Sequence, residues 1–107
     1  MELVYSYLKI KKIAKKIKEN NKISSMVEIV QFIFSDEDIF ELFVKEGADC
    51  KDYKEAQELI SQAMIDGVDY FDLQKKVIEA LIEANFYKRE LQEMLKTLEV
   101  QNTTAQN

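Results

Sequence analysis

From Asp69 to Glu99 the chain reads DYFDLQKKVIEALIEANFYKRELQEMLKTLE, without a glycine or a proline. Small, apolar or aromatic side chains recur along this run at alternating steps of four and three residues. They are Leu73, Val77, Ala80, Ala84, Tyr87, Leu91, Met94 and Leu98. This spacing keeps one stripe of side chains on a single helix face. The run therefore predicts a long helix that faces one partner surface.

The length of this predicted helix constrains the fold. One unbroken helix of about thirty residues would be ~45 Å long, at about 1.5 Å per residue. A compact chain of this size has a radius of gyration of only about 13 Å. Two alternatives follow. Either the helix breaks near Asn85 and its second half folds back, or part of the stripe projects and needs a partner.

The composition of the whole chain favours an all-α fold. The 107 residues include no proline and two glycines, so the tight hairpins of an all-β fold lack turn residues. Residues 1–100 are predicted to form one compact bundle of five helices, or six if the chain breaks at Asn85. The polar stretch QNTTAQN, residues 101–107, lacks periodicity and predicts a disordered tail.

Capping residues predict where the other helices begin and end. The first helix is expected at Leu3–Glu19, where an apolar stripe is surrounded by lysines. Side-chain oxygens at the start of a helix accept hydrogen bonds from its free amide groups, and glycine often follows its end. By this rule the predicted N-caps are Ser24 or Ser25, Ser35 and Asp69, and the predicted ends are Gly47 and Gly67. The helix between Gly47 and Gly67 is expected to begin at Lys51 or Asp52.

The residue inventory argues against an enzyme. The chain has no histidine, the commonest general base and metal ligand, and with the single Cys50 it cannot build a Cys–His pair or an ordinary zinc site. Its two glycines are isolated, so it has no glycine-rich phosphate loop. The acidic residues of Asp66–Asp72 lack the alternating spacing of an EF-hand, and a helix end followed by a helix cap explains them. We predict no catalytic residue, no cofactor and no metal.

The sequence also shows no signal for export or membrane insertion. The start, MELVYSYLKI, lacks the basic region of a signal peptide, and the uncharged run Ile29–Phe34 is far shorter than the ~20 residues of a membrane span. The lone cysteine is common in intracellular proteins. The prediction is a soluble, cytoplasmic protein with no membrane partner.

Charge is distributed unevenly along the chain. Residues 1–22 carry seven lysines and two glutamates, whereas the rest carries eight basic and eighteen acidic side chains. The lysines form a basic face on the first helix, represented by Lys9, Lys12, Lys15 and Lys16. This face is either solvated or docks on an acidic surface of another copy or of a partner. Nucleic acid is a weaker alternative, because the acidic body repels phosphates and Arg89 is the single arginine.

The second half of the long run contains the candidate partner-binding residues. Tyr87 lies on the predicted stripe and Phe86 lies about 100° away around the helix, so one thin contact cannot bury both. Either the core is broad there, or these rings belong to an interaction surface. The candidate partner-binding residues are Phe86, Tyr87, Leu91, Met94 and Leu98. The same side chains could instead complete the protein's own core.

The segment Tyr53–Glu99 resembles the tail assembly chaperones of long-tailed (siphovirus-type) bacteriophages of Gram-positive hosts. The resemblance rests on a helix, the acidic-glycine turn MIDGVD, the aromatic pair in NFY, and a final helix rich in lysine and glutamate. The lysine-rich N-terminal helix departs from that group, many of whose members begin with a short β-type segment.

The resemblance implies a non-enzymatic protein that binds the helical tape-measure protein and helps to recruit tail-tube subunits in the host cytoplasm. A methionine-containing apolar stripe suits such binding, because methionine adapts to varied partner surfaces. Self-association into a homo-oligomer through the helix stripes and the charge asymmetry is a further expectation. The alternative is a small helical regulatory or nucleic-acid-associated protein that uses the basic N-terminal helix.

Overall fold

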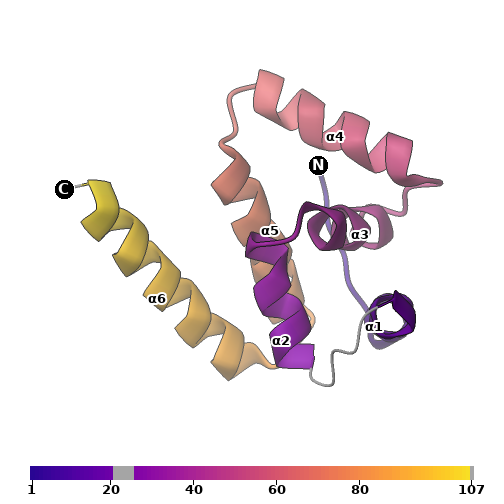
Figure 1. The fold of residues 1–107 in the computed structure, drawn as a ribbon, viewed down its shortest axis with the longest axis horizontal. Helices are drawn as coiled ribbons and strands as arrows, with labels where there is room; N and C mark the ends of the chain where they lie inside the picture. The colour runs from indigo at the N-terminus through magenta and orange to yellow at the C-terminus, as the bar shows by residue number, and fades with distance from the viewer. Residues whose placement is uncertain (21–25, 107) are drawn as a thin grey trace.

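The structure is a computed structural model that describes the backbone of residues 1–20 and 26–106, and their side chains except those of residues 20, 26, 27, 29 and 100–106. Every regular element within these residues is a helix (Figure 1). The elements are α1 (Tyr7–Asn20), α2 (Met26–Gln31), the 3-10 helix η1 (Phe32–Phe34), α3 (Glu37–Gly47), α4 (Tyr53–Ile65), α5 (Tyr70–Glu83) and α6 (Lys88–Gln106). The all-α prediction is confirmed, and the long run does break at Asn85.

Helix α3 occupies the middle of the bundle. Its Phe40, Phe43 and Val44 are fully buried, and the helix packs against α1, η1, α4 and α5. Helix α5 supplies the other large part of the core, through Leu73, Val77, Ile78 and Leu81. Figure 1 shows α1 viewed nearly end-on beside α3, with α4 across the top and α6 inclined away from α5. Helices α3 and α5 therefore supply most of the core, and α1, η1, α4 and α6 add further buried side chains to it.

Aspartate side chains begin three of the helices. Asp36, Asp52 and Asp69 have extended backbones. The Asp36 carboxylate accepts from two amide groups in the first turn of the helix that follows, and those of Asp52 and Asp69 accept from one each. Asp52 and Asp69 confirm the predicted starts of α4 and α5. For α3 the expected cap was Ser35, but Asp36 holds this position because its carboxylate accepts from the amides of Asp38 and Ile39. The expected cap at Ser24 or Ser25 lies outside the described residues.

Three helices end in the same way. Asp49, Gly67 and Asn85 each follow a helix with a positive φ of 54°, 99° and 59°, respectively. In each case two backward amide hydrogen bonds close the last turn; after α5 they run from Asn85 N to Ile82 O and from Phe86 N to Leu81 O. This is the Schellman arrangement, which favours glycine or asparagine at the left-handed residue. The prediction that Gly47 has this role for α3 is wrong, because the left-handed residue is Asp49.

The N-terminal segment differs from the sequence prediction. Residues 1–6 are not helical, and α1 begins at Tyr7 with Ser6 hydroxyl accepting from the amide of Lys9 at 3.3 Å. The cause is Tyr5, whose buried hydroxyl donates to the carbonyl of Phe43 at 2.6 Å. The amide of Val4 also donates to Gly47 O at 2.9 Å. These bonds satisfy polar groups against α3 and hold the segment on that helix.

Gly47 is required at this contact because it leaves room for Tyr5. A Cβ atom built on Gly47 would lie 2.6 Å from Cζ and from the hydroxyl oxygen of Tyr5. The ring of Tyr5 also meets that of Phe43 edge-on, with the centroids 6.2 Å apart. The end of α3 thus has a glycine for steric reasons and not to reverse the chain.

The C-terminal end also differs from the prediction. Helix α6 continues to Gln106, whereas residues 101–107 were expected to be disordered. No glycine or proline follows Glu99, so nothing in the sequence interrupts the intrahelical hydrogen bonds of α6. Asn107 lies outside the described residues.

The contact between Gly47 and Tyr5 predicts the effect of a single methyl group. Gly47→Ala should lower the free energy of unfolding by about 1–3 kcal/mol, the usual cost of overpacking a core. At an ordinary helical site the same change is stabilising by about 1 kcal/mol. Urea unfolding, monitored by circular dichroism, measures the change in the free energy of unfolding. In a Tyr5→Ala background the cost of Gly47→Ala should disappear; an undiminished cost would contradict the steric explanation.

The left-handed turn at Asn85 predicts a pair of opposite effects. Asn85→Ala should lower the free energy of unfolding by about 1 kcal/mol, because a Cβ-bearing residue without a polar side chain is disfavoured at positive φ. Asn85→Gly should leave stability unchanged or raise it slightly. Thermal unfolding of the two variants compares them directly, and each is the matched control for the other. If Asn85→Ala and Asn85→Gly were equally stable, the result would argue against a left-handed backbone at residue 85.

Candidate functional site

Helix α6 folds back on α5, so its stripe is shared between the core and the surface. Leu91 is fully buried, and Met94 and Leu95 are half-buried against the core. Further along, the ammonium group of Lys75 on α5 lies 3.7 Å from the carboxylate of Glu99. Leu98 is half-buried. Of the two alternatives, the stripe therefore folds back, and it keeps one accessible edge.

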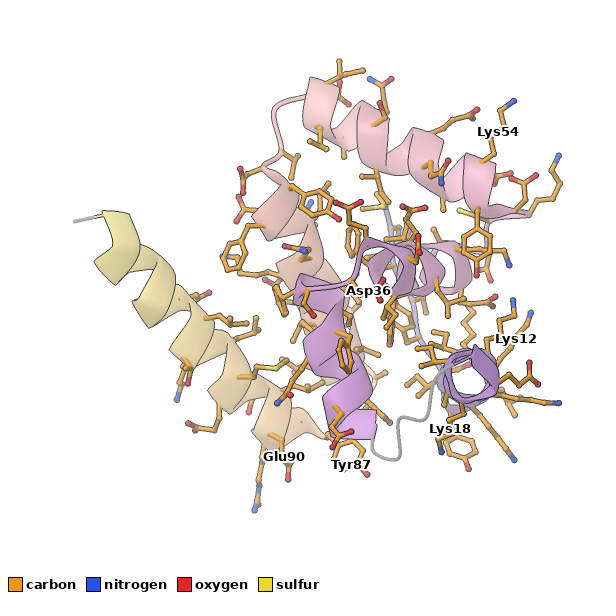
Figure 2. All side chains as sticks on the ribbon, viewed as in Figure 1. Lys12, Lys18, Asp36, Lys54, Tyr87 and Glu90 are labelled. Carbon is orange, nitrogen blue, oxygen red and sulfur yellow. The ribbon has the colours of Figure 1, made fainter. Side chains whose placement is uncertain are left out.

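The aromatic pair that precedes α6 lies in the turn and not on the helix. Phe86 is half-buried against the core, whereas Tyr87 is 47% exposed and has a φ of 45°. Their rings meet edge-on with centroids 4.8 Å apart. Figure 2 shows Tyr87 at the lower end of the molecule, next to the start of α6 and Glu90. Tyr87 therefore does not continue the helical stripe, because the break at Asn85 removes it from the helix.

A groove runs between α6 and the α2–η1 segment. It encloses about 430 Å³ and has an apolar floor with a polar rim. The floor is formed by Phe34, Leu91, Met94 and Leu98, and the rim by Gln31, Glu90, Glu93 and Thr97. Three of the five residues predicted to bind a partner thus line one depression, and the other two lie in the turn beside α6.

The groove has the chemistry of a site for an apolar helix face. Its floor combines an aromatic ring, two leucines and a methionine, and a methionine side chain adapts its shape to different partners. The orientation of Phe34 is set by Phe71 of α5, whose ring centroid is 5.8 Å away. The charged residues that line the groove, Glu90 and Glu93, are both acidic. Such a groove suits an amphipathic helix that lays its apolar stripe on the floor.

Sequence reasoning missed the side of the groove that the α2–η1 segment forms. Neither Phe34 nor Gln31 is among the partner-binding residues predicted from the sequence. Phe34 follows α2 in the short 3-10 helix η1 and is half-buried. Its proximity to Leu98 results from the chain reversal at Asn85, which no local pattern near Phe34 reveals.

The predicted basic face of α1 is largely directed at the end of α3. Lys9 lies 3.1 Å from the carboxylate of Asp49 and also donates to the carbonyl of Val4. Lys12 and Lys16 both lie 3.5 Å from the carboxylate of Glu46.

Viewed down α1, Lys12 and Lys18 point to different sides of the helix (Figure 2). Lys15 is exposed, and lines a shallow depression with Lys11 and Lys18. The four lysines predicted as one face therefore do not act together. Lys9, Lys12 and Lys16 form ion pairs within the protein, whereas Lys15 is exposed.

Glu46 is the acidic centre of this cluster. Its carboxylate is 9% exposed and receives Lys45 at 3.2 Å in addition to Lys12 and Lys16. Burial by itself would raise the pKa of Glu46, but the hydrogen bond and charge of Lys45 and the charges of Lys12 and Lys16 outweigh it and lower the pKa. The interaction joins α1 to α3 and reduces the positive charge that α1 presents to a partner.

The described residues contain no cluster of side chains that could form a metal centre. No group of three or more histidine, cysteine, aspartate or glutamate side chains among them could hold a metal ion. Burial raises the pKa of the Cys50 thiol, and neighbouring carboxylates add to this effect, so the thiol is poorly suited to act as a nucleophile. No helix in the described part of the chain is long and apolar enough to cross a membrane.

Comparison of the chain with family models, curated proteins and solved structures finds no match. The resemblance to tail assembly chaperones therefore stays a prediction from the sequence.

The Glu46 cluster predicts a pH-dependent contribution to stability. Glu46→Gln should lower the free energy of unfolding at neutral pH by about 1.5–3 kcal/mol, as for hydrogen bonds to charged groups. Because folding lowers the pKa of Glu46, its contribution is present above the ordinary pKa of 4.5 and is lost as the pH falls through the lower folded value. The free energies of unfolding of the wild type and of Glu46→Gln should therefore become equal as the pH falls, and urea unfolding at a series of acidic pH values measures this.

Asp49→Asn serves as the matched control, because its carboxylate is 77% exposed and pairs with one lysine. At neutral pH this substitution should lower the free energy of unfolding by less than Glu46→Gln does. A stability difference between wild type and Glu46→Gln that does not change below the ordinary pKa would contradict the assignment.

Proposed function

We propose that this protein is a non-enzymatic helical binding module that holds the apolar face of a protein partner's amphipathic helix. The site is the groove between α6 and the α2–η1 segment. The protein's task in this proposal is to cover an apolar stripe reversibly, and no chemical step is involved.

One observation carries the proposal, namely that α6 leaves its apolar edge accessible while it packs on α5. Leu91 is 1% exposed and belongs to the core, yet Met94 and Leu98 continue the same stripe along the groove. Phe34 supplies the opposite side of this apolar floor from a segment far away in the sequence. A stripe that is buried at one end and open at the other offers a continuous apolar surface supported by a folded core.

The dimensions of the groove support a helix as the ligand. Its α6 wall extends from Glu90 to Leu98, which spans about two turns or ~12 Å of helix axis. A partner helix of similar length would place apolar residues at steps of three and four along the floor. Tyr87, 47% exposed at one end of α6, could extend this contact.

The tape-measure protein is the specific partner that we propose from the sequence resemblance. A long helical protein with apolar stripes needs such covering until its own assembly partners arrive. In this proposal the module keeps that helix soluble and helps to recruit tail-tube subunits in the host cytoplasm. Capture of an apolar helix is compatible with the groove, and the identity of the partner rests on the resemblance.

Co-expression with a candidate tape-measure protein tests this proposal. The wild-type chain should increase the soluble fraction of the tape-measure protein and copurify with it. Leu98→Asp should abolish both effects, because it places a charge on the groove floor, where it lacks a partner. Leu91 is unsuitable for this test because its burial would make the substitution unfold the protein.

Gln92→Asp provides the matched control, since it adds the same charge to an exposed position of α6 that does not line the groove. It should retain copurification at the wild-type level. Circular dichroism and thermal unfolding of each variant establish that the fold persists. Copurification of the folded Leu98→Asp protein at the wild-type level would exclude the groove as the binding site.

A further inference from the structure

A second groove lies between α3, α4 and the beginning of α5, apart from the site proposed above. It encloses about 420 Å³. Its lining is formed by Glu37 and Glu41 of α3, by Gln57, Ile60, Ser61 and Met64 of α4, and by Tyr70 of α5. None of these residues lines the α6 groove or was singled out as a candidate site in the sequence.

The charge around this groove is strongly negative. Residues 36–72, which include α3 and α4, carry twelve acidic and three basic side chains. The two charged residues that line the groove, Glu37 and Glu41, are both carboxylates. Burial and then the charges of Glu37 and Glu41 raise the pKa of the Tyr70 hydroxyl, so both carboxylates act electrostatically at the groove.

Apolar surface accompanies this charge. Met64 is 47% exposed and Ile65, the next residue, is 74% exposed, whereas Ile60 lies deeper at 9%. The ring of Tyr70 is fixed by Phe40, with centroids 5.2 Å apart. Glu41 is likewise held in place, because its carboxylate accepts from the Gln57 amide at 2.7 Å. The groove therefore has an ordered aromatic ring in its lining, and one of its two carboxylates, Glu41, is held by a hydrogen bond.

The α4 residues that line the groove set the length of ligand surface that it can contact. Gln57, Ile60, Ser61 and Met64 follow one another at helical steps over two turns of α4, about 10 Å. A ligand that runs along this wall needs an apolar stripe of the same length. The carboxylates of α3 on the other side require cationic groups next to that stripe.

We propose that this second groove binds a cationic amphipathic helix of a protein partner, with lysine or arginine beside an apolar stripe about two turns long. Apolar residues of the ligand pack on Met64, Ile60 and Tyr70. Its cationic side chains pair with Glu37 and Glu41. The protein would then have two separate docking grooves, and this one selects its ligand by charge.

Synthetic helical peptides test the proposal without any knowledge of the natural partner. Three peptides share one leucine stripe and differ in the flanking residues, which are lysine, glutamine or glutamate. Fluorescence anisotropy with the whole chain should show the lysine peptide binding at least about tenfold more tightly than the glutamine peptide. The glutamate peptide should bind least. High salt should reduce the preference for lysine, because it screens exposed charges.

Substitutions in the protein locate the binding site. Glu37→Gln with Glu41→Gln should weaken the lysine peptide about tenfold and leave the glutamine peptide unchanged. Met64→Ser should weaken both peptides, because it removes part of the apolar floor. Glu55→Gln with Glu58→Gln is the matched control, since it removes two carboxylates from exposed positions of α4 outside the groove. This control should bind as the wild type does, and circular dichroism verifies each fold.

Several outcomes would overturn the proposal. Equal affinity for the three peptides would refute charge selection, and binding unaffected by the Glu37 and Glu41 substitutions would place the ligand elsewhere. Self-association of the chain that these substitutions abolish would assign the groove to a second copy. Leu98→Asp should not change lysine-peptide binding, so the test is independent of the α6 groove and of the function proposed for it.

Discussion

The left-handed backbone at Asn85 reverses the chain between α5 and α6, and the candidate docking groove exists because of that reversal. The hydrogen bonds of the Schellman turn end α5 at a defined residue and direct α6 back along it. Leu91 then enters the core, and the rest of the α6 stripe comes to face the α2–η1 segment. Without the reversal, the same side chains would lie on an extended helix with no opposite wall.

A second constraint operates at the C-terminal end of α3. Gly47 admits the ring of Tyr5, and Glu46 attracts Lys12 and Lys16 to the same end of the helix. Together these contacts attach the N-terminal segment and α1 to the bundle by packing, hydrogen bonding and charge. They also determine what α1 offers to a partner, because lysines that pair with buried or neighbouring carboxylates contribute less to an external electrostatic field.

Local patterns predicted much of this architecture, and they failed where distant residues interact. The length of the apolar stripe gave a break near Asn85 as one of two alternatives, and the caps at Asp52 and Asp69 followed from their position before helical runs. The prediction of helix from Leu3 failed because Tyr5 bonds to Phe43, 38 residues away. Phe34 was missed as part of the candidate site for the same reason, since the α6 residues with which it lines the groove are distant in sequence.

By itself, the sequence determined that this protein is all-α, where its apolar stripes lie, and which chemistries its residue types disfavour. Those properties depend on side chains a few residues apart and on composition. Only the tertiary structure decided which part of each stripe the protein buries itself and which lysines it neutralises. Burial and ion pairing depend on how helices from distant parts of the chain pack together. The spacing of apolar residues along one helix does not predict that packing.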